Sequence, residues 1–337
     1  MKTKRIPSII LILALTAALL LSCAKKEDPM PAVRTLDESE EYTFGTFTYM
    51  KNTDGTAVIT SYGGNDTTLV IPTSLDGCSI VGIDAGAFAE NEMLTWVTLP
   101  TALETIGEYA FAYCKALSRV DMGAKLWSVG AAAFVDTPWL DSLTDEFAVV
   151  GNGVLLKYSG SGGCVDIPSG VKYIGDAFTM NGNIIGVSMP DTLRYIGDSA
   201  FAYCTELRSV EFNDGLISIG NSAFEGCENL PALLLGDSLT TIGEYAFRDC
   251  YALSYVKLGR SVEVINSGAF LSAQRLKLIY LPRSLQKIDS KAFGDCFSLA
   301  LVLYESSEEA FGEIDCASSN YLLTEAERRC DYSGGIE

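Results

Sequence analysis

Cysteine is the side chain with the widest choice of chemistry in this sequence, because its sulfur can carry a lipid, form a disulfide, bind a metal or attack a substrate. The chain has ten cysteines and no histidine. Without histidine, Ser-His-Asp and Cys-His catalysis and imidazole metal sites are excluded. The sequence also lacks a phosphate-binding Gly-x-x-x-x-Gly-Lys-Ser/Thr loop, a Gly-x-Gly-x-x-Gly turn and a calcium loop. We therefore expect no metal, no cofactor and no enzyme activity.

The first cysteine, Cys23, follows a segment typical of export. Three basic side chains within the first five residues precede an apolar run over 9–21, which is too short to span a membrane comfortably. The run ends in Leu-Leu-Ser-Cys, which resembles a bacterial lipobox. The resemblance implies a lipoprotein signal peptide over 1–22, a lipid on Cys23 and a flexible tether over 23–41. It also implies anchoring to the outer membrane through the lipid alone, and the charged residues at 25–28 resemble a signal for display on the cell exterior.

Five other cysteines share one position, three residues after a phenylalanine. They are Cys114, Cys204, Cys227, Cys250 and Cys296. Because Asn, Thr and Ala fill this position in other copies, it favours a small, partly buried side chain, and we expect free thiols in the core rather than disulfides. Cys78 and Cys164 fall outside the pattern. Cys316 and Cys330 also lie outside it, and they either form a disulfide or stay reduced.

The dipeptide Ala-Phe marks an internal repeat. Its phenylalanines are separated by 23 residues, except for one interval of 44. These repeat phenylalanines are Phe88, Phe111, Phe134, Phe178, Phe201, Phe224, Phe247, Phe270 and Phe293. Because one such unit cannot bury its apolar face alone, the units must stack and share a continuous core. The spacing therefore predicts a repeat solenoid.

The columns around each phenylalanine predict the shape of one unit. Val97 and Leu99 are two residues apart, so both point to one face of a short strand. Gly107 and its equivalents, replaced by Asp or Asn in some copies, predict a left-handed turn. Segments such as 112–116 are expected to make a short helical turn back to the next strand.

Two stretches carry the pattern nearly in full, from Val97 to Cys114 and from Val187 to Cys204. They read as a Val-x-Leu-Pro strand, with Met in the second copy, followed by Leu-x-x-Ile-Gly-x-x-Ala-Phe-x-x-Cys. This resembles the BspA-like bacterial leucine-rich repeats, over about residues 42–304. The resemblance implies a leucine-rich-repeat solenoid of the α/β horseshoe class, β-rich with short helical turns and a 23-residue period. It also implies a cell-surface or secreted protein that adheres to host matrix proteins, host cells or other bacteria.

Two stretches interrupt the period. Residues 42–60, with a turn at 52–55, predict a hairpin that caps the solenoid at its N-terminus. Residues 138–163 hold a Gly-Asn-Gly turn between two apolar runs and predict an inserted hairpin. Residues 305–337 are expected to form a C-terminal cap or tail. One solenoid over 42–304 leaves no room for a separate catalytic domain, so the plentiful carboxylates are not expected to form a glycosidase-like acid pair.

The strand positions between the buried columns point outward and form a face on which a partner can bind. The candidate partner-binding residues are Trp96, Arg119, Tyr255, Lys257, Leu278, Tyr280 and Leu301. The first half of this face is mixed and polar, whereas the second half is apolar and aromatic. An apolar patch of this kind usually marks a contact. That contact is either internal, with the tail residues 317–326 folded back over the patch, or a site for a protein or glycan.

The formal net charge of −19 disfavours nucleic acid as a partner, because such a surface repels phosphate backbones. We expect a non-catalytic, cell-surface lipoprotein that mediates protein–protein interaction or adhesion, with a host matrix protein or a bacterial surface protein as partner. Two alternatives stay open: a scaffold protein within the cell envelope, and a glycan-binding surface lipoprotein.

Overall fold

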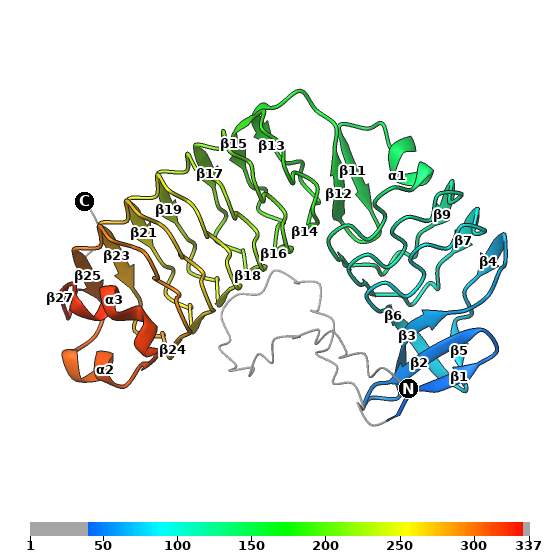
Figure 1. The fold of residues 1–337 in the computed structure, drawn as a ribbon, viewed down its shortest axis with the longest axis horizontal. Helices are drawn as coiled ribbons and strands as arrows, with labels where there is room; N and C mark the ends of the chain where they lie inside the picture. Colours follow the sequence, from blue (N-terminus) through cyan, green and yellow to red (C-terminus); the bar gives the residue numbers. More distant parts are fainter. Residues whose placement is uncertain (1–39, 333–337) are drawn as a thin grey trace. The chain divides into compact units, whose positions relative to one another are not determined.

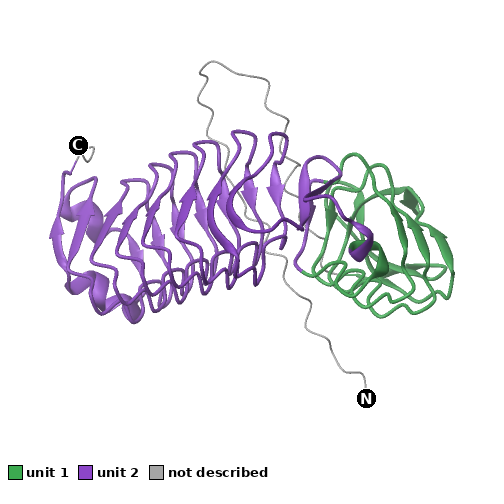
Figure 2. Ribbon diagram, turned by 90° about the horizontal axis from the view of Figure 1, so that it is seen from above, with its two compact units in different colours: residues 1–126, 132–140 green, residues 127–131, 141–337 purple. Residues whose placement is uncertain are grey.

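The computed structural model of the chain describes residues 40–332. The expected signal peptide, Cys23 and nearly all of the expected tether lie outside these residues. The described chain forms two compact units, coloured separately in Figure 2. The first unit comprises residues 40–126 and 132–140, and the second comprises residues 127–131 and 141–332.

Each complete coil of a unit contributes two short strands. Strands at the predicted Val-x-Leu positions are β4 (Thr68–Val70), β7 (Trp96–Thr98), β9 (Arg119–Asp121), β13 (Gly163–Asp166), β15 (Ile184–Ser188), β17 (Ser209–Glu211), β19 (Ala232–Leu234), β21 (Tyr255–Lys257), β23 (Leu278–Leu281) and β25 (Leu301–Tyr304). Strands that end at or near the repeated Ile are β6 (Cys78–Ile83), β8 (Thr105–Ile106), β10 (Ser128–Val129), β14 (Tyr173–Ile174), β16 (Tyr195–Ile196), β18 (Ser218–Ile219), β20 (Thr241–Ile242), β22 (Val264–Ile265) and β24 (Lys287–Ile288). Figure 1 shows β15 to β25 as successive rungs.

Strands at equivalent positions pair in parallel, and the side chains between the two ladders form the core. In the first unit the ladders are β4-β7-β9 and β3-β6-β8. In the second they are β13-β15-β17, β19-β21-β23-β25 and β12-β14-β16-β18-β20-β22-β24. The register places each residue opposite its equivalent 23 positions on, as with Val256 and Ile279. The repeat period therefore becomes a stack of identical columns, as the sequence predicts.

The repeat phenylalanines lie face to face through the core and are at most 1% exposed. In the first unit the ring centroids are 4.8 Å apart for Phe88–Phe111 and 5.2 Å apart for Phe111–Phe134. In the second unit, from Phe178 to Phe293, neighbouring centroids are 4.7 to 5.4 Å apart. We call these two columns the Phe stacks. The spacing of a ring contact thus matches the spacing of hydrogen-bonded strands, about 4.8 Å.

An antiparallel hairpin opens each unit. In the first unit β1 (Tyr42–Phe44), β2 (Phe47–Lys51) and β3 (Thr56–Tyr62) pair in order, and β3 then pairs in parallel with β6. The short strand β5 (Ser74–Leu75) also pairs with β6. In the second unit β11 (Phe147–Val150) pairs with β12 (Val154–Tyr158), which then pairs in parallel with β14.

The two hairpins present the same aromatic pair to the first ring of their Phe stack. Tyr62 lies 5.1 Å from Phe88, and Tyr158 lies 4.9 Å from Phe178. A phenylalanine backs each tyrosine, Phe47 at 5.1 Å and Phe147 at 5.2 Å. A tyrosine suits the end of a stack because its ring covers apolar surface while its hydroxyl finds polar partners. One hairpin thus precedes each of the two Phe stacks.

Short helices close the two units. Helix α1 (Pro138–Ser142) places Trp139 edge-on against Phe134, with centroids 4.6 Å apart. Helix α2 (Glu308–Gly312) places Phe311 edge-on against Tyr304 at 5.4 Å.

Beyond α2 the second unit ends in β26 (Asp315–Cys316), η1 (Ser318–Asn320), α3 (Tyr321–Glu325) and β27 (Glu327–Arg329). Strand β27 pairs with β25, and charged side chains on such an outermost strand discourage further strand pairing.

The glycine column has a different cause from the one predicted. Gly107 has no positive φ, but a Cβ added to it would lie 2.5 Å from the backbone nitrogen of Ala85 in the preceding coil. The predicted left-handed turn at this column is therefore wrong, and close approach of two backbones favours glycine there. Left-handed residues instead flank the phenylalanine at two positions, as with Tyr109 (φ 54°) and Tyr113 (φ 60°). A left-handed residue interrupts a right-handed helix. Residues 112–116 therefore form a non-helical turn instead of the predicted helical turn.

The cysteine column consists of free, buried thiols, as predicted. Each Sγ donates a hydrogen bond to the carbonyl oxygen of the phenylalanine in the preceding coil. The distances are 3.1 Å for Cys114 and Cys204, 3.2 Å for Cys296, and 3.3 Å for Cys227 and Cys250. Burial raises the pKa of Cys204 and Cys296 to about 12, so both thiols stay protonated at neutral pH. Cys316 and Cys330 are also free in the structure.

Removal of one ring from a Phe stack should destabilise the second unit strongly. Phe224→Ala is expected to lower the free energy of unfolding by about 3 to 5 kcal/mol, because the variant loses buried area and leaves a cavity between two rings. Denaturant titration of the full chain measures this change. Phe44→Ala is the control, because Phe44 is 50% exposed, and it should cost no more than about 0.5 kcal/mol. Equal losses in the two variants would contradict the role of the Phe stack.

Thiol labelling should separate the buried column cysteines from Cys164, the one exposed cysteine among residues 40–332. In the folded chain at neutral pH, iodoacetamide is expected to modify Cys164, which is exposed, and to leave the five column cysteines unmodified until denaturant is added. Peptide mass mapping after timed labelling gives the order of reaction, with Cys164→Ser as the control that removes the fast site. Rapid modification of Cys227 in the folded chain would show that the cysteine column is accessible to the reagent.

Candidate functional site

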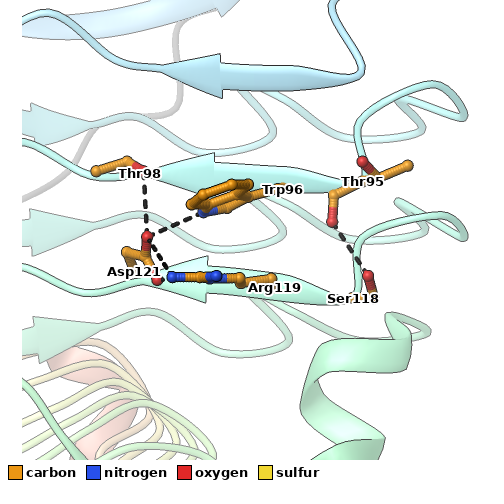
Figure 3. Close-up of polar contacts among 6 residues, drawn as sticks. All are labelled: Thr95, Trp96, Thr98, Ser118, Arg119 and Asp121. Atoms are coloured by element: carbon orange, nitrogen blue, oxygen red, sulfur yellow. Dashed lines mark hydrogen bonds and ion pairs between the residues drawn. The ribbon is translucent and has the colours of Figure 1, made fainter.

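The outward face of β4, β7 and β9 carries a compact cluster of polar and aromatic side chains, shown in Figure 3. The parallel register places Trp96 beside Arg119 and Thr98 beside Asp121. The guanidinium carbon of Arg119 lies 4.0 Å from the centroid of the Trp96 ring, which is a cation–π contact. We call Trp96, Thr98, Arg119 and Asp121 the Trp–Arg cluster.

The sequence of each strand explains why these side chains point outward. Val97 and Val120 are buried in the core, at 0% and 8% exposure. Since side chains alternate along a strand, the residues on either side of each valine point to the opposite face. Two rows follow from the register, and in one of them Val70 precedes Thr98 and Asp121. Val70 is 68% exposed and is not among the predicted partner-binding residues, although its place between the apolar Leu69 and Ile71 marks it as an outward strand position.

Asp121 holds the cluster together through hydrogen bonds. Its Oδ2 accepts from the indole nitrogen of Trp96 at 2.9 Å and from the hydroxyl of Thr98 at 3.3 Å. Arg119 donates from Nε to Oδ1 at 3.0 Å and from a terminal nitrogen to Oδ2 at 3.3 Å. These bonds, led by the one from Arg119, lower the pKa of Asp121. Asp121 is therefore an ionised, fully partnered carboxylate that fixes its neighbours, and it is a poor candidate for a general acid or base.

The outward face of the second unit forms two rows across β21, β23 and β25. One row contains Tyr255, Leu278 and Leu301, and the other contains Lys257, Tyr280 and Leu303. The structure thus brings together the five candidate residues from Tyr255 to Leu301, and it places Trp96 and Arg119 together in the other unit.

The C-terminal tail covers part of this second face. The Tyr280 hydroxyl donates to the backbone oxygen of Tyr332 at 3.1 Å, and the two rings meet edge-on at 5.7 Å. Tyr280 is only 5% exposed, so this arrangement of the tail leaves little of its side chain open to an external partner. The tail residue that contacts Tyr280 is Tyr332, which lies beyond the segment 317–326 that was expected to fold back. Within that predicted segment Leu323 is fully buried, whereas Tyr321 is 51% exposed.

Neither unit offers a site for a metal or a membrane span within residues 40–332. No group of three His, Cys, Asp or Glu side chains in this part of the chain is arranged to hold a metal ion. No helix among the same residues is long and apolar enough to cross a membrane. The predicted lipidation site, Cys23, lies outside the described residues.

Three solved structures of bacterial proteins are similar to this chain. A leucine-rich cell surface protein from Faecalibacterium prausnitzii A2-165 is 19% identical, with coverage of 84% of this chain and 99% of that one and a TM-score of 0.42. The pneumococcal vaccine antigen PcpA is 16% identical, with coverage of 83% and 97% and a TM-score of 0.39. A leucine-rich repeat protein from T. pallidum is 24% identical, with coverage of 77% and 91% and a TM-score of 0.32. A comparison with curated proteins gave no match.

The family assignment rests on the repeat itself. A model of the BspA-type leucine-rich repeat region matches residues 81–181 and 172–300, in six copies. The matched segments make up more than half of the chain and include all nine repeat phenylalanines. The solenoid fold and the family expected from the sequence are both confirmed: the chain belongs to the BspA-type leucine-rich repeat family.

Proposed function

We propose that this chain is a non-catalytic binding protein that recognises a protein partner through the Trp–Arg cluster of the first unit. The observation that carries the proposal is the pairing of a partly exposed tryptophan with an arginine whose side chain is 59% exposed, both fixed by one carboxylate. Tryptophan and arginine are the residues that most often dominate the binding energy of protein interfaces.

Preorganisation supports the same proposal. The hydrogen bonds to Asp121 hold Trp96 and Arg119 in one arrangement before a partner arrives, so less conformational entropy is lost on binding. Val70 adds an exposed apolar side chain beside the cluster. The outward face of the second unit is the weaker candidate for partner binding, because the tail already contacts Tyr280 there.

We further propose that the protein is exported and anchored by a lipid on Cys23, and that it faces the cell exterior. The lipobox-like sequence that ends at Cys23 supports anchoring. On this proposal the partner is a host matrix protein or a protein of another bacterial surface, and the function is adhesion. An envelope scaffold or a glycan-binding surface lipoprotein would use the same anchor, so the location of the chain distinguishes the scaffold from the other two.

Substitution within the Trp–Arg cluster should abolish partner binding without loss of fold. The full chain is used to capture partners from host matrix and bacterial surface extracts, and the Kd of each captured protein is then measured. Trp96→Ala and Arg119→Ala should each cost about 2 kcal/mol or more, roughly a thirtyfold rise in Kd, as expected of interface hot spots. Lys125→Ala is the matched control, because it removes an exposed basic side chain that belongs to the same unit but lies in a turn rather than on a strand. Unchanged Kd values for Trp96→Ala and Arg119→Ala would refute the proposed site.

Protease treatment of intact cells should release the solenoid units. If the lipid on Cys23 holds the chain on the exterior, trypsin added outside will remove it from the cell, and Cys23→Ser will release the chain into soluble fractions. Immunoblotting of cell-associated and soluble fractions measures both effects, with a periplasmic protein as the control for cell integrity. Protection of the native chain from trypsin would favour an envelope scaffold instead.

A further inference from the structure

Three consecutive coils of the second unit form a shallow pocket on the turn segments that follow the repeat phenylalanines. Its volume is about 290 Å³. The lining residues are Glu228, Asn229, Tyr251, Ala252, Gln274 and Arg275. They occupy the fourth and fifth positions after Phe224, Phe247 and Phe270, which are equivalent positions in the repeat.

The solenoid arranges these residues as two short rows. Glu228, Tyr251 and Gln274 follow one another in the first row, and Asn229, Ala252 and Arg275 do so in the second. Ala252 has the smallest side chain of the six and stands between Asn229 and Arg275, so the hollow opens over the middle coil beside Tyr251. The pocket is therefore a product of the sequence at two repeat positions, rather than a gap in the fold.

The polar side chains around the hollow are available to a ligand. Among the described residues, no hydrogen bond or ion pair reaches the side chains of Glu228, Gln274 and Arg275. Asn229 donates from Nδ2 to the backbone oxygen of Thr205 at 2.8 Å, which leaves its side-chain oxygen free to accept. One carboxylate and one guanidinium balance each other in charge. The pocket thus offers several donors and acceptors without a net preference for an ion.

Aromatic rings continue the first row beyond the pocket. Tyr251 is 38% exposed, and Phe297, two coils further on at the same repeat position, is 66% exposed. The two coils place these residues roughly 10 Å apart along the row, with Gln274 between them. The fold does not require a ring here, since Gly182 and Thr205 fill the same position in other coils of this unit. Phe297 is thus an exposed ring that the core does not require, and its face is open to a ligand.

From this arrangement we infer that the pocket binds a neutral oligosaccharide, laid along the row from Glu228 to Phe297. Sugar rings have apolar faces that pack on aromatic side chains, and their hydroxyls both donate and accept hydrogen bonds. Planar amide, carboxylate and guanidinium groups form hydrogen bonds with those hydroxyls, and exposed tyrosine and phenylalanine rings pack on the apolar faces. This site lies on the turn segments of the second unit. It does not rest on the proposed role of the Trp–Arg cluster.

The test is an array of short neutral oligosaccharides of glucose, galactose, mannose and N-acetylglucosamine, with heparin fragments and oligogalacturonate as charged probes. The full chain, solubilised in detergent, should bind at least one neutral probe. Calorimetry with that probe should then show that Tyr251→Ala raises Kd by about tenfold or more. Phe297→Ala should weaken longer oligosaccharides and leave the shortest ones unchanged.

Two control variants separate the outcomes. Met180→Ala removes a side chain that is 73% exposed elsewhere on the turn segments of this unit, and Trp96→Ala disrupts the Trp–Arg cluster; neither should change the affinity for sugar. Binding of charged probes alone, failure of every neutral probe, or equal affinities of the native chain and Tyr251→Ala would each overturn the inference. Loss of sugar binding in Trp96→Ala would assign the glycan to the first unit instead.

Discussion

Phenylalanine rings of successive coils stack on one another, and this contact sets the geometry of both the core and the outward rows. Hydrogen bonds between parallel strands fix the coil spacing at about 4.8 Å, and a stacked pair of rings fits that spacing. Ring centroids 4.7 to 5.4 Å apart throughout the second unit show that both conditions hold together. The repeated alanine, the close glycine backbones and the thiols bonded to the preceding carbonyl all serve this one spacing. The same spacing aligns the outward side chains into rows.

The sequence predicts the parts of this fold that repeat. The period of 23 residues, the buried columns and the free thiols follow from the spacing of the repeated residues, because equivalent residues occupy the same environment in every coil. Features that occur once are harder to predict. Each Tyr-Phe hairpin pair is visible in the sequence, but the division into two units depends on contacts between coils. The cover over Tyr280 comes from Tyr332, which no periodic pattern could connect to it. The left-handed residues escaped prediction because tyrosine, rather than glycine, fills several of them.

The sequence predicts those features of the candidate site that follow from the alternation of side chains along a strand. Trp96 and Arg119 were recognised as outward neighbours, and the register confirms that they are paired. Asp121 is not among the candidate residues predicted from the sequence, because its role depends on four hydrogen bonds that spacing does not specify. A solenoid of this kind separates stability from recognition. The inward columns are constrained by the stack, so the outward rows are free to vary and can carry different binding chemistry in each unit.

We propose that a protein partner binds on the Trp–Arg cluster, and oxidative footprinting of the partner complex measures that contact. The chain has three tryptophans, of which Trp96 and Trp127 are partly exposed and Trp139 is buried. Hydroxyl-radical labelling followed by mass mapping compares Trp96 with Trp127 in the free and bound chain. We expect binding to protect Trp96 and to leave Trp127 unchanged. Full oxidation of Trp96 in the saturated complex would contradict the claim.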